Sequence, residues 1–283
     1  MTTHIQLHPC AKVNLGLNIV GIRQDGYHDI ETVFYPIPLC DELTVALQSS
    51  SDAGMPACHL TMEGRPIEGK TSDNLVVRAY HLLADDMPLP PVHVTLRKVI
   101  PTQAGLGGGS SDAAAMLNAL NSLFNLHLSH DTLQCYAARL GADCAFFITS
   151  EPAFATGIGD VLTPISLNLS GWHLLLVKPD DAVSTREAYA GVSSVHPAVC
   201  CRDAVARPVE EWHACLRNDF ELSVLPQHPR IADVRRRMKQ LHANYIQLSG
   251  SGSTMFALSR RSLSEAHDLC HLFGDCWWRE LVL

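Results

Sequence analysis

The segment Pro101-Thr-Gln-Ala-Gly-Leu-Gly-Gly-Gly-Ser-Ser-Asp-Ala-Ala114 joins two elements that the sequence predicts with different periods. Before it, apolar and polar residues alternate at 92–96, which predicts a strand. After it, apolar residues recur every three or four positions at 113–124, which predicts a helix. Glycines between them let the backbone approach a ligand closely, and the first N–H groups of a helix attract anions. The segment therefore predicts a phosphate-binding turn at 105–111.

Other interpretations of these glycines depend on their spacing. A Walker-type loop ends in Gly-Lys-Ser or Gly-Lys-Thr, and no lysine follows these glycines. A dinucleotide fingerprint reads Gly-x-Gly-x-x-Gly, but Ser110 stands where the third glycine belongs. A flexible turn that binds nothing is the remaining alternative, and the glycines alone leave it open.

The composition is that of an ordinary globular protein. Hydrophobic residues make up 47% and charged residues 18% of the chain, so a core of domain size can form. A net charge of −8 disfavours a general nucleic-acid binder, which needs a basic face. No apolar run approaches the roughly 20 residues of a membrane span, and no signal peptide is recognisable. We therefore expect a cytoplasmic protein with no nucleic-acid or membrane partner, as a monomer or weak homodimer.

The ten cysteines do not predict a metal site. No C-x-x-C occurs, and no four cysteine and histidine positions match a zinc pattern. The absence of a secretory signal indicates a reducing compartment, in which the thiols stay free. No residue is therefore assigned as a metal ligand.

The order of the predicted elements indicates two α+β domains. Further strands are predicted at 13–19, 43–47, 172–177, 245–248, 254–258 and 276–282. Further helices are predicted at 73–83, after the capping residues Ser129, Ser184 and Ser262, and through 231–241. Glycine and proline cluster at 157–171, and we place the boundary between domains 1–160 and 161–283 there.

Two more motifs stand in the order that a known superfamily shows. The residues Ala-Lys-Val-Asn-Leu occupy 11–15, and a second glycine turn, Leu-Ser-Gly-Ser-Gly-Ser-Thr-Met-Phe-Ala, occupies 248–257. Together with the segment 101–114, they resemble the three ordered motifs of the GHMP kinase superfamily. The resemblance implies an α+β, two-domain GHMP kinase fold with the active site in the cleft between the domains.

Shorter segments resemble one family within this superfamily. They read Arg-Gln-Asp-Gly-Tyr-His at 23–28, Leu-Gly-Ala-Asp-Cys-Ala-Phe-Phe at 140–147 and Asn-Asp-Phe-Glu at 218–221. All three are similar to the family of 4-diphosphocytidyl-2-C-methyl-D-erythritol kinases of the non-mevalonate isoprenoid pathway. The resemblance implies transfer of the γ-phosphoryl group of ATP, accompanied by Mg²⁺, to the 2-hydroxyl of 4-diphosphocytidyl-2-C-methyl-D-erythritol, a small-molecule substrate.

The same resemblance implies a catalytic pair. Asp143 would be the base, or the carboxylate that orients the accepting hydroxyl, and Lys12 would be its cationic partner. Phosphoryl transfer depends on positioning and charge stabilisation more than on a strong base, because its transition state is loose. Without the resemblance, Lys12 would be interpreted as a solvated lysine at the end of a strand, and Asp143 as a helix cap.

The resemblance also implies two sets of binding residues. The nucleotide set is Gly105, Leu106, Gly107, Gly108, Gly109, Ser110 and Ser111 around the phosphates, with Asn74 and Lys98 near the adenosine. The substrate set is Asn14, Tyr27, His28, Phe34, Thr185, Tyr189, Gly250 and Ser251. Thr185 and Tyr189 stand four positions apart, so one helix can present both to one pocket.

The sequence also departs from the family pattern. Gln103 stands where the family has glycine, and the superfamily's magnesium-coordinating glutamate has no clear counterpart. Among rival functions, a homoserine kinase gives no reason for the Asp-Gly-Tyr-His at 25–28. A dinucleotide-dependent oxidoreductase explains the glycines but not Lys12 or Asp143, and a non-catalytic nucleotide-binding module leaves the same pair unexplained.

Overall fold

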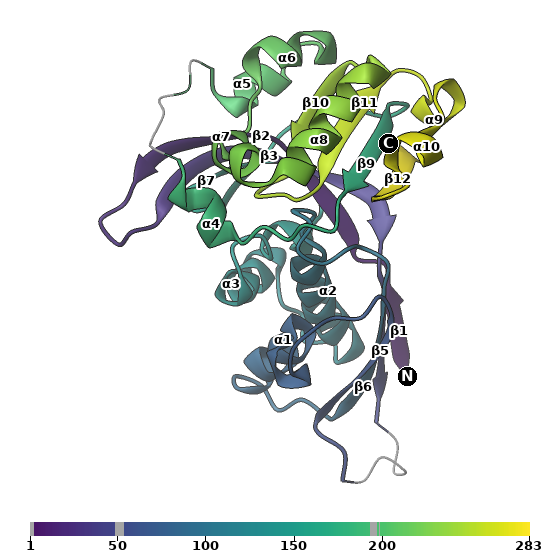
Figure 1. Cartoon of the computed structure of the whole chain (residues 1–283). Coiled ribbons are helices and arrows are strands. Elements are labelled where there is room, and N and C mark those ends of the chain that lie inside the picture. The colour runs from purple at the N-terminus through teal and green to yellow at the C-terminus, as the bar shows by residue number, and fades with distance from the viewer. Residues whose placement is uncertain (1–2, 49–53, 193–196, 198) are drawn as a thin grey trace. The chain divides into compact units, whose positions relative to one another are not determined.

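The computed structural model describes residues 3–48, 54–192, 197 and 199–283, which form two compact units (Figure 1). Unit 1 comprises Met1–Ala11, Leu39–Thr102 and Gly107–Glu151. Unit 2 comprises Lys12–Pro38, Gln103–Leu106 and Pro152–Leu283. Both units are discontinuous in sequence, so they do not follow a single cut along the chain. The linear division into domains 1–160 and 161–283 stays a prediction.

Unit 1 contains a four-stranded sheet in the order β1-β4-β6-β5. Its strands are β1 (His4–Leu7), β4 (Glu42–Leu47), β5 (Cys58–Gly64) and β6 (Val92–Lys98). The strands pair antiparallel except β5 and β6, which run parallel and are connected through the helix α1 (Leu75–Ala84). The predicted strands at 43–47 and 92–96 are confirmed, and their alternation reflects burial of every second residue.

Helix α2 (Gly108–Leu123) packs against β1, β4 and α1, and α3 (His130–Leu140) packs against α1 and α2 (Figure 1). Alanines at 113–115 are buried in α2, and their small side chains allow close packing of its first turns. The predicted helix is confirmed but begins earlier, at Gly108. The residue before it, Gly107, has a φ of +70°, and this left-handed residue ends the turn and starts the helix.

Two further four-stranded sheets belong mainly to unit 2, with the orders β2-β3-β7-β8 and β10-β11-β9-β12. The first consists of β2 (Cys10–Ile22), β3 (His28–Cys40), β7 (Ala153–Thr156) and β8 (Val161–Pro164). The second consists of β9 (His173–Lys178), β10 (Tyr245–Leu248), β11 (Met255–Ser259) and β12 (Trp277–Val282), paired antiparallel. All five strands predicted within unit 2 are confirmed to within a few residues at their ends.

Unit 2 contains seven α-helices among its described residues. They are α4 (Thr185–Ala190), α5 (Cys201–Val205), α6 (Trp212–Cys215), α7 (Phe220–Gln227), α8 (Pro229–Met238), α9 (Leu263–Ala266) and α10 (Leu269–Phe273). Of these, α4, α7, α8, α9 and α10 contribute to one hydrophobic core. Helix α8 packs on β10 and β11, and its predicted core residues Ile231, Val234 and Met238 are fully buried. The predicted cap of α4 is confirmed, since the Glu187 N–H donates to the Ser184 hydroxyl over 3.1 Å.

The described part of the chain also bears on membranes, metals and thiols. No helix in it has the length and apolar character that crossing a membrane requires. It contains no group of three or more His, Cys, Asp or Glu side chains arranged to hold a metal ion. All ten cysteines are free thiols.

Candidate active site

The second half of the glycine turn, which is predicted to bind phosphate, is the start of α2, in unit 1. The first bond of the helix joins the Ser111 N–H to the Gly107 carbonyl over 2.9 Å. The N–H groups of Gly108, Gly109 and Ser110 precede that bond and donate to none of the described residues. A Cβ on Gly109 would meet only a Leu75 methyl group, at 3.8 Å, so the surroundings of this position are open. Free N–H groups beside open space fit a phosphate group.

The first half of the turn lies in unit 2 against the second glycine turn. Gly105 has a φ of +71°, and its carbonyl accepts a hydrogen bond of 2.8 Å from the Ser249 hydroxyl. A Cβ on Gly105 would lie 2.0 Å from the Ser249 carbonyl oxygen, so only glycine fits here. The Leu106 carbonyl accepts from the Lys12 N–H over 3.0 Å, which holds the turn to β2.

The backbone conformation at Gln103 is one that favours glycine, the residue that the family pattern has at this position. Its φ is +50°, in the left-handed region that favours glycine, and its side chain is exposed. The side chain therefore tolerates replacement, while the backbone carries the strain.

Gln103→Gly is expected to be about 1 kcal/mol more stable than Gln103→Ala, because only alanine keeps a Cβ in the left-handed conformation. Both variants lose the same exposed side chain, so each is the control for the other. Urea unfolding of the two proteins measures the difference. Equal free energies of unfolding would show that this residue carries no strain.

A buried charge cluster lies beneath the first residue of α2, within unit 1. Lys98 donates to the carboxylates of Asp41 and Asp112, and the second contact measures 2.7 Å. Asp41 also accepts from the Ile100 N–H over 2.9 Å. A Cβ on Gly108 would lie 3.3 Å from the Lys98 ammonium, so the cluster supports the second half of the turn. An adenosine contact by Lys98 stays a prediction, and the Lys98 ammonium already donates to two carboxylates.

Burial raises the pKa of Asp112, Lys98 lowers it and the neighbouring Asp41 raises it, and together they give a pKa of about 7. One Asp112 carboxylate oxygen, Oδ1, is buried and has no hydrogen-bond partner among the described residues. The folded state is therefore more stable with the Asp112 carboxyl group neutral than with it ionised.

Asp112→Asn is expected to be more stable than the wild type above pH 7. Because the folded-state pKa lies above the usual 3.8, the wild type loses stability as the pH rises from about 4 to about 7. The amide stays neutral, so the advantage of the variant should grow across this window and then level off. Urea unfolding at pH 4.5, 6 and 8 measures it, and an advantage that does not change with pH would contradict the assignment.

The turn that carries Asp143 lies beside the start of α2, in unit 1. It connects α3 to the 3-10 turn Phe146–Ile148, and the Cys144 N–H donates to the Gly141 carbonyl over 3.1 Å. Burial raises the pKa of the Cys144 thiol and the nearby side chain of Ser110, in the first turn of α2, lowers it, and the 3-10 turn itself packs against α2. The structure therefore brings the predicted carboxylate segment to the predicted phosphate helix. Asp143 is no helix cap, because Ala145 holds that position.

Asn74 caps the neighbouring helix α1. Its side-chain oxygen accepts from the Val76 N–H over 2.9 Å, and the next residue, Leu75, approaches Gly109. Asn74 therefore stands near the start of α2, and its contact with adenosine stays a prediction.

Lys12 lies on β2 in unit 2 and is only 3% exposed, which excludes a solvated lysine at a strand end. Its ammonium donates to the Asn14 side-chain oxygen over 2.5 Å and lies 5.0 Å from the centre of the Phe34 ring. Lys12 thus contacts both of these predicted substrate residues, Asn14 and Phe34. A fully buried lysine is rare unless its ammonium has partners, and Asn14 and the Phe34 ring are two of those that Lys12 has.

The predicted aromatic contacts also meet in unit 2. His28, at the start of β3, stacks on Tyr189 of α4 with ring centres 4.6 Å apart and planes 20° apart. Tyr189 meets Phe220 edge to face. Thr185 is exposed in the first turn of the same short helix, and Tyr27 is 61% exposed in the turn before β3. Exposed polar groups beside stacked rings suit an aromatic head group.

The second glycine turn lies next to Asn14. Gly250 has a φ of +53°, and a Cβ on it would lie 3.1 Å from the Asn14 side-chain oxygen. Ser251 follows it and is half-buried. The turn is held by Asn218, whose side-chain amide donates to the carbonyls of Leu248 and Gly250 over 2.9 and 2.8 Å. Asn218 is part of a quoted motif, yet its role could not be predicted, because both its partners are distant in sequence.

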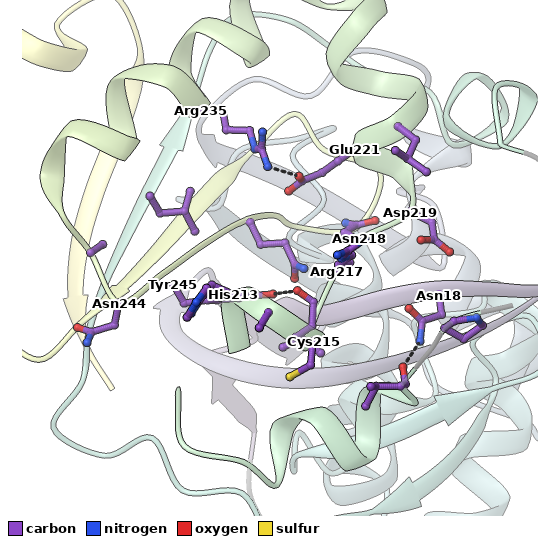
Figure 2. Close-up of a pocket in the computed structure, with 18 of the residues that line it drawn as sticks. Asn18, His213, Cys215, Arg217, Asn218, Asp219, Glu221, Arg235, Asn244 and Tyr245 are labelled. Atoms are coloured by element: carbon purple, nitrogen blue, oxygen red, sulfur yellow. Dashed lines mark hydrogen bonds and ion pairs between the residues drawn. The ribbon is translucent and has the colours of Figure 1, made fainter. Parts of the chain in front are cut away.

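A cavity of about 710 Å³ lies in unit 2 and is lined by Asn218 and its neighbours (Figure 2). Glu221 accepts from the Leu248 N–H over 2.9 Å and pairs with Arg235 at 3.1 Å, while Asp219 accepts from the Ile19 N–H over 2.8 Å. Burial raises the pKa of both carboxyl groups. These carboxylates are used to hold β2 and the strand before the second glycine turn, so this wall of the cavity supports the site.

Comparisons with known proteins agree with this arrangement. The sequence-family model of the GHMP kinases N terminal domain matches residues 74–151, and the family model of the GHMP kinases C terminal domain matches residues 202–269. A 4-diphosphocytidyl-2-C-methyl-D-erythritol kinase of Bacteroides fragilis is 50% identical over 250 residues, which cover 88% of this chain and 90% of the relative.

Solved structures extend the comparison to the fold. A crystal structure of 4-(cytidine 5'-diphospho)-2C-methyl-D-erythritol kinase superposes with a TM-score of 0.79 and 31% identity, covering 99% of this chain and 100% of the other. A homoserine kinase from Cytophaga hutchinsonii has a TM-score of 0.70 at 16% identity, covers 100% of this chain and 95% of its own, and shows the fold alone. The chain therefore belongs to the GHMP kinases and, among them, to the family of the 4-diphosphocytidyl-2-C-methyl-D-erythritol kinases.

Proposed function

We propose that the protein transfers the γ-phosphoryl group of ATP to the 2-hydroxyl of 4-diphosphocytidyl-2-C-methyl-D-erythritol. The observation that carries the proposal is the position of the Asp143 turn beside the free N–H groups of α2. A carboxylate next to a phosphate site is the arrangement that transfer to an alcohol requires. The identity of the alcohol rests on the relative from Bacteroides fragilis, which carries the name of this kinase.

The nucleotide is proposed to bind along the glycine turn. Its phosphates accept hydrogen bonds from the free N–H groups of Gly108, Gly109 and Ser110, and the adenosine lies toward Asn74 and Lys98. Mg²⁺ accompanies ATP and neutralises charge on the phosphates when the complex is bound. The start of α2 fits the phosphates that would carry this ion, because it offers free N–H donors and open space.

Asp143 is proposed to orient the accepting hydroxyl and to take up its proton. Lys12 is proposed to stabilise the negative charge on the oxygens of the transferred group. Its buried ammonium, held by Asn14, is a fixed charge that needs no reorganisation during the reaction. These roles require Asp143 to reach the accepting hydroxyl and Lys12 to reach the phosphoryl group that this hydroxyl receives.

The remaining substrate residues are proposed to bind the cytidine diphosphate and the erythritol. The stacked rings of His28 and Tyr189 provide an aromatic face for the base. The residues Asn14, Tyr27, Phe34, Thr185, Gly250 and Ser251 are proposed to surround the rest of the substrate. The cytoplasmic location and the state of monomer or weak homodimer stay predictions.

One assay tests the reaction. Purified protein with Mg-ATP and 4-diphosphocytidyl-2-C-methyl-D-erythritol should release ADP, and phosphorus NMR should detect a new phosphate ester on the erythritol. Parallel reactions with homoserine and mevalonate are the specificity controls. Turnover of either control, with none of the cytidyl substrate, would overturn the substrate assignment while leaving a kinase in place.

A further inference from the structure

A chain of three hydrogen bonds lies behind Lys12. The Lys12 ammonium donates to Asn14 Oδ1 over 2.5 Å, Asn14 Nδ2 donates to Thr32 Oγ1 over 3.0 Å, and the Thr32 hydroxyl donates to the Gly16 carbonyl over 2.5 Å. All four residues that make these three hydrogen bonds belong to unit 2. The three side chains are buried, with exposed fractions of 3%, 2% and 0% in the same order. Water therefore does not replace a bond that is lost.

The direction of each bond follows from chemistry. A carbonyl oxygen only accepts, so the single hydroxyl proton of Thr32 is directed to Gly16. The Thr32 oxygen is then left as an acceptor, which only the NH₂ side of the Asn14 amide can use. The oxygen side of that amide must therefore face Lys12. A reversed amide would place donors against an ammonium group, and Thr32 prevents this.

Gly16, the last acceptor in this series of hydrogen bonds, is held firmly within β2. The Gly16 N–H donates to the Gln247 side chain over 2.8 Å, and Gly16 has a φ of +73°. A Cβ on Gly16 would lie 2.5 Å from a Leu216 methyl group, so the backbone is closely packed at this point. The Gly16 carbonyl is thus held in place, and the three hydrogen bonds connect it to the Lys12 ammonium through Thr32 and Asn14.

We propose that Thr32 is a positioning residue for phosphoryl transfer, which fixes the Asn14 amide and through it directs the Lys12 ammonium toward the reacting phosphate. The role of Lys12 in this statement rests on the proposed function. The fixing of Asn14 and Lys12 by Thr32 rests on the hydrogen bonds alone. Thr32 does not touch the substrate itself.

Two substitutions test the proposal. Thr32→Val keeps the shape and removes the hydroxyl, whereas Thr32→Ser keeps the hydroxyl and removes a methyl group. Thr32→Val is expected to lower kcat about tenfold, the size of one neutral hydrogen bond. KM for ATP should stay within about twofold, because the glycine turn is unchanged. Thr32→Ser should recover most of kcat, and equal losses in both variants would overturn the proposal.

A double mutant separates positioning from simple support of the fold. In a Lys12→Met background, Thr32→Val should lower the residual kcat by less than about twofold, because the group it positions is gone. A residue that only supports the fold would lower kcat by the same factor in both backgrounds. Melting temperatures of all variants establish that the proteins compared are folded.

Crystal structures give a result that does not depend on the substrate. In Thr32→Val, the Asn14 amide should rotate or the bond from Lys12 should break, while Thr32→Ser should keep both. If the wild type released no ADP with the cytidyl substrate, the proposed function would fail, and the crystal structures would still decide the role of Thr32. An unchanged Lys12–Asn14 bond in Thr32→Val would overturn it.

Discussion

Asp143→Asn is expected to lower kcat about a thousandfold and to leave the Kd for ATP within about twofold of the wild type. Asparagine keeps the shape of the side chain, but it carries no charge and takes up no proton. Residue 143 lies between α3 and the 3-10 turn Phe146–Ile148, which both pack against α2 independently of this side chain, so the free N–H groups of the helix should not move. Steady-state kinetics measures kcat, and calorimetric titration with Mg-ATP measures Kd.

The matched control for this variant is Asp131→Asn. Asp131 is an exposed carboxylate in the first turn of α3, in the same unit. The control should keep full activity and lose at most about 1 kcal/mol of stability, through its interaction with the helix dipole. Full activity of Asp143→Asn would mean that its carboxylate has only a structural role.

The fold could be predicted from the sequence where one residue pattern determines one element. The strand β6 and the helix α2 follow from periods of two and of three to four, and the glycines between them locate the turn. The strand β3 could not be predicted, although it has 13 residues. It contains Pro36 and Pro38, which lack an N–H group and argue against a strand. Its pairing with β2 and β7 overrides that local preference.

The site could be predicted only as far as residue type and motif allow. The glycines, Asp143 and Lys12 stand in recognisable segments, and the structure supports their use. Thr32 and Asp41 could not be predicted, because their roles depend on partners far along the chain. Thr32 bonds to residues 16 and 18 positions away, and Asp41 pairs with Lys98 at a separation of 57. A sequence gives the chemistry of each side chain, and only folding determines which groups meet.

Lys12→Met is expected to lower kcat about a thousandfold, as the loss of a fixed charge at a transition state does. Lys12→Arg should not restore it. The guanidinium group is larger than the ammonium, and the site is 3% exposed with Asn14 at 2.5 Å, so the longer side chain does not fit the same position. Lys70→Met, at an exposed position, is the control and should keep full activity.

Stability distinguishes this loss of activity from unfolding. Burying an ammonium is unfavourable by several kcal/mol, and methionine removes that charge while keeping an apolar side chain beside Phe34. The Asn14 oxygen loses its donor in exchange, which costs about 1–3 kcal/mol. Because the first effect is at least as large as the second, the melting temperature of Lys12→Met should not fall below that of the wild type. A protein that loses its activity but none of its stability places Lys12 in the chemistry, whereas a large fall in melting temperature would place it in the fold.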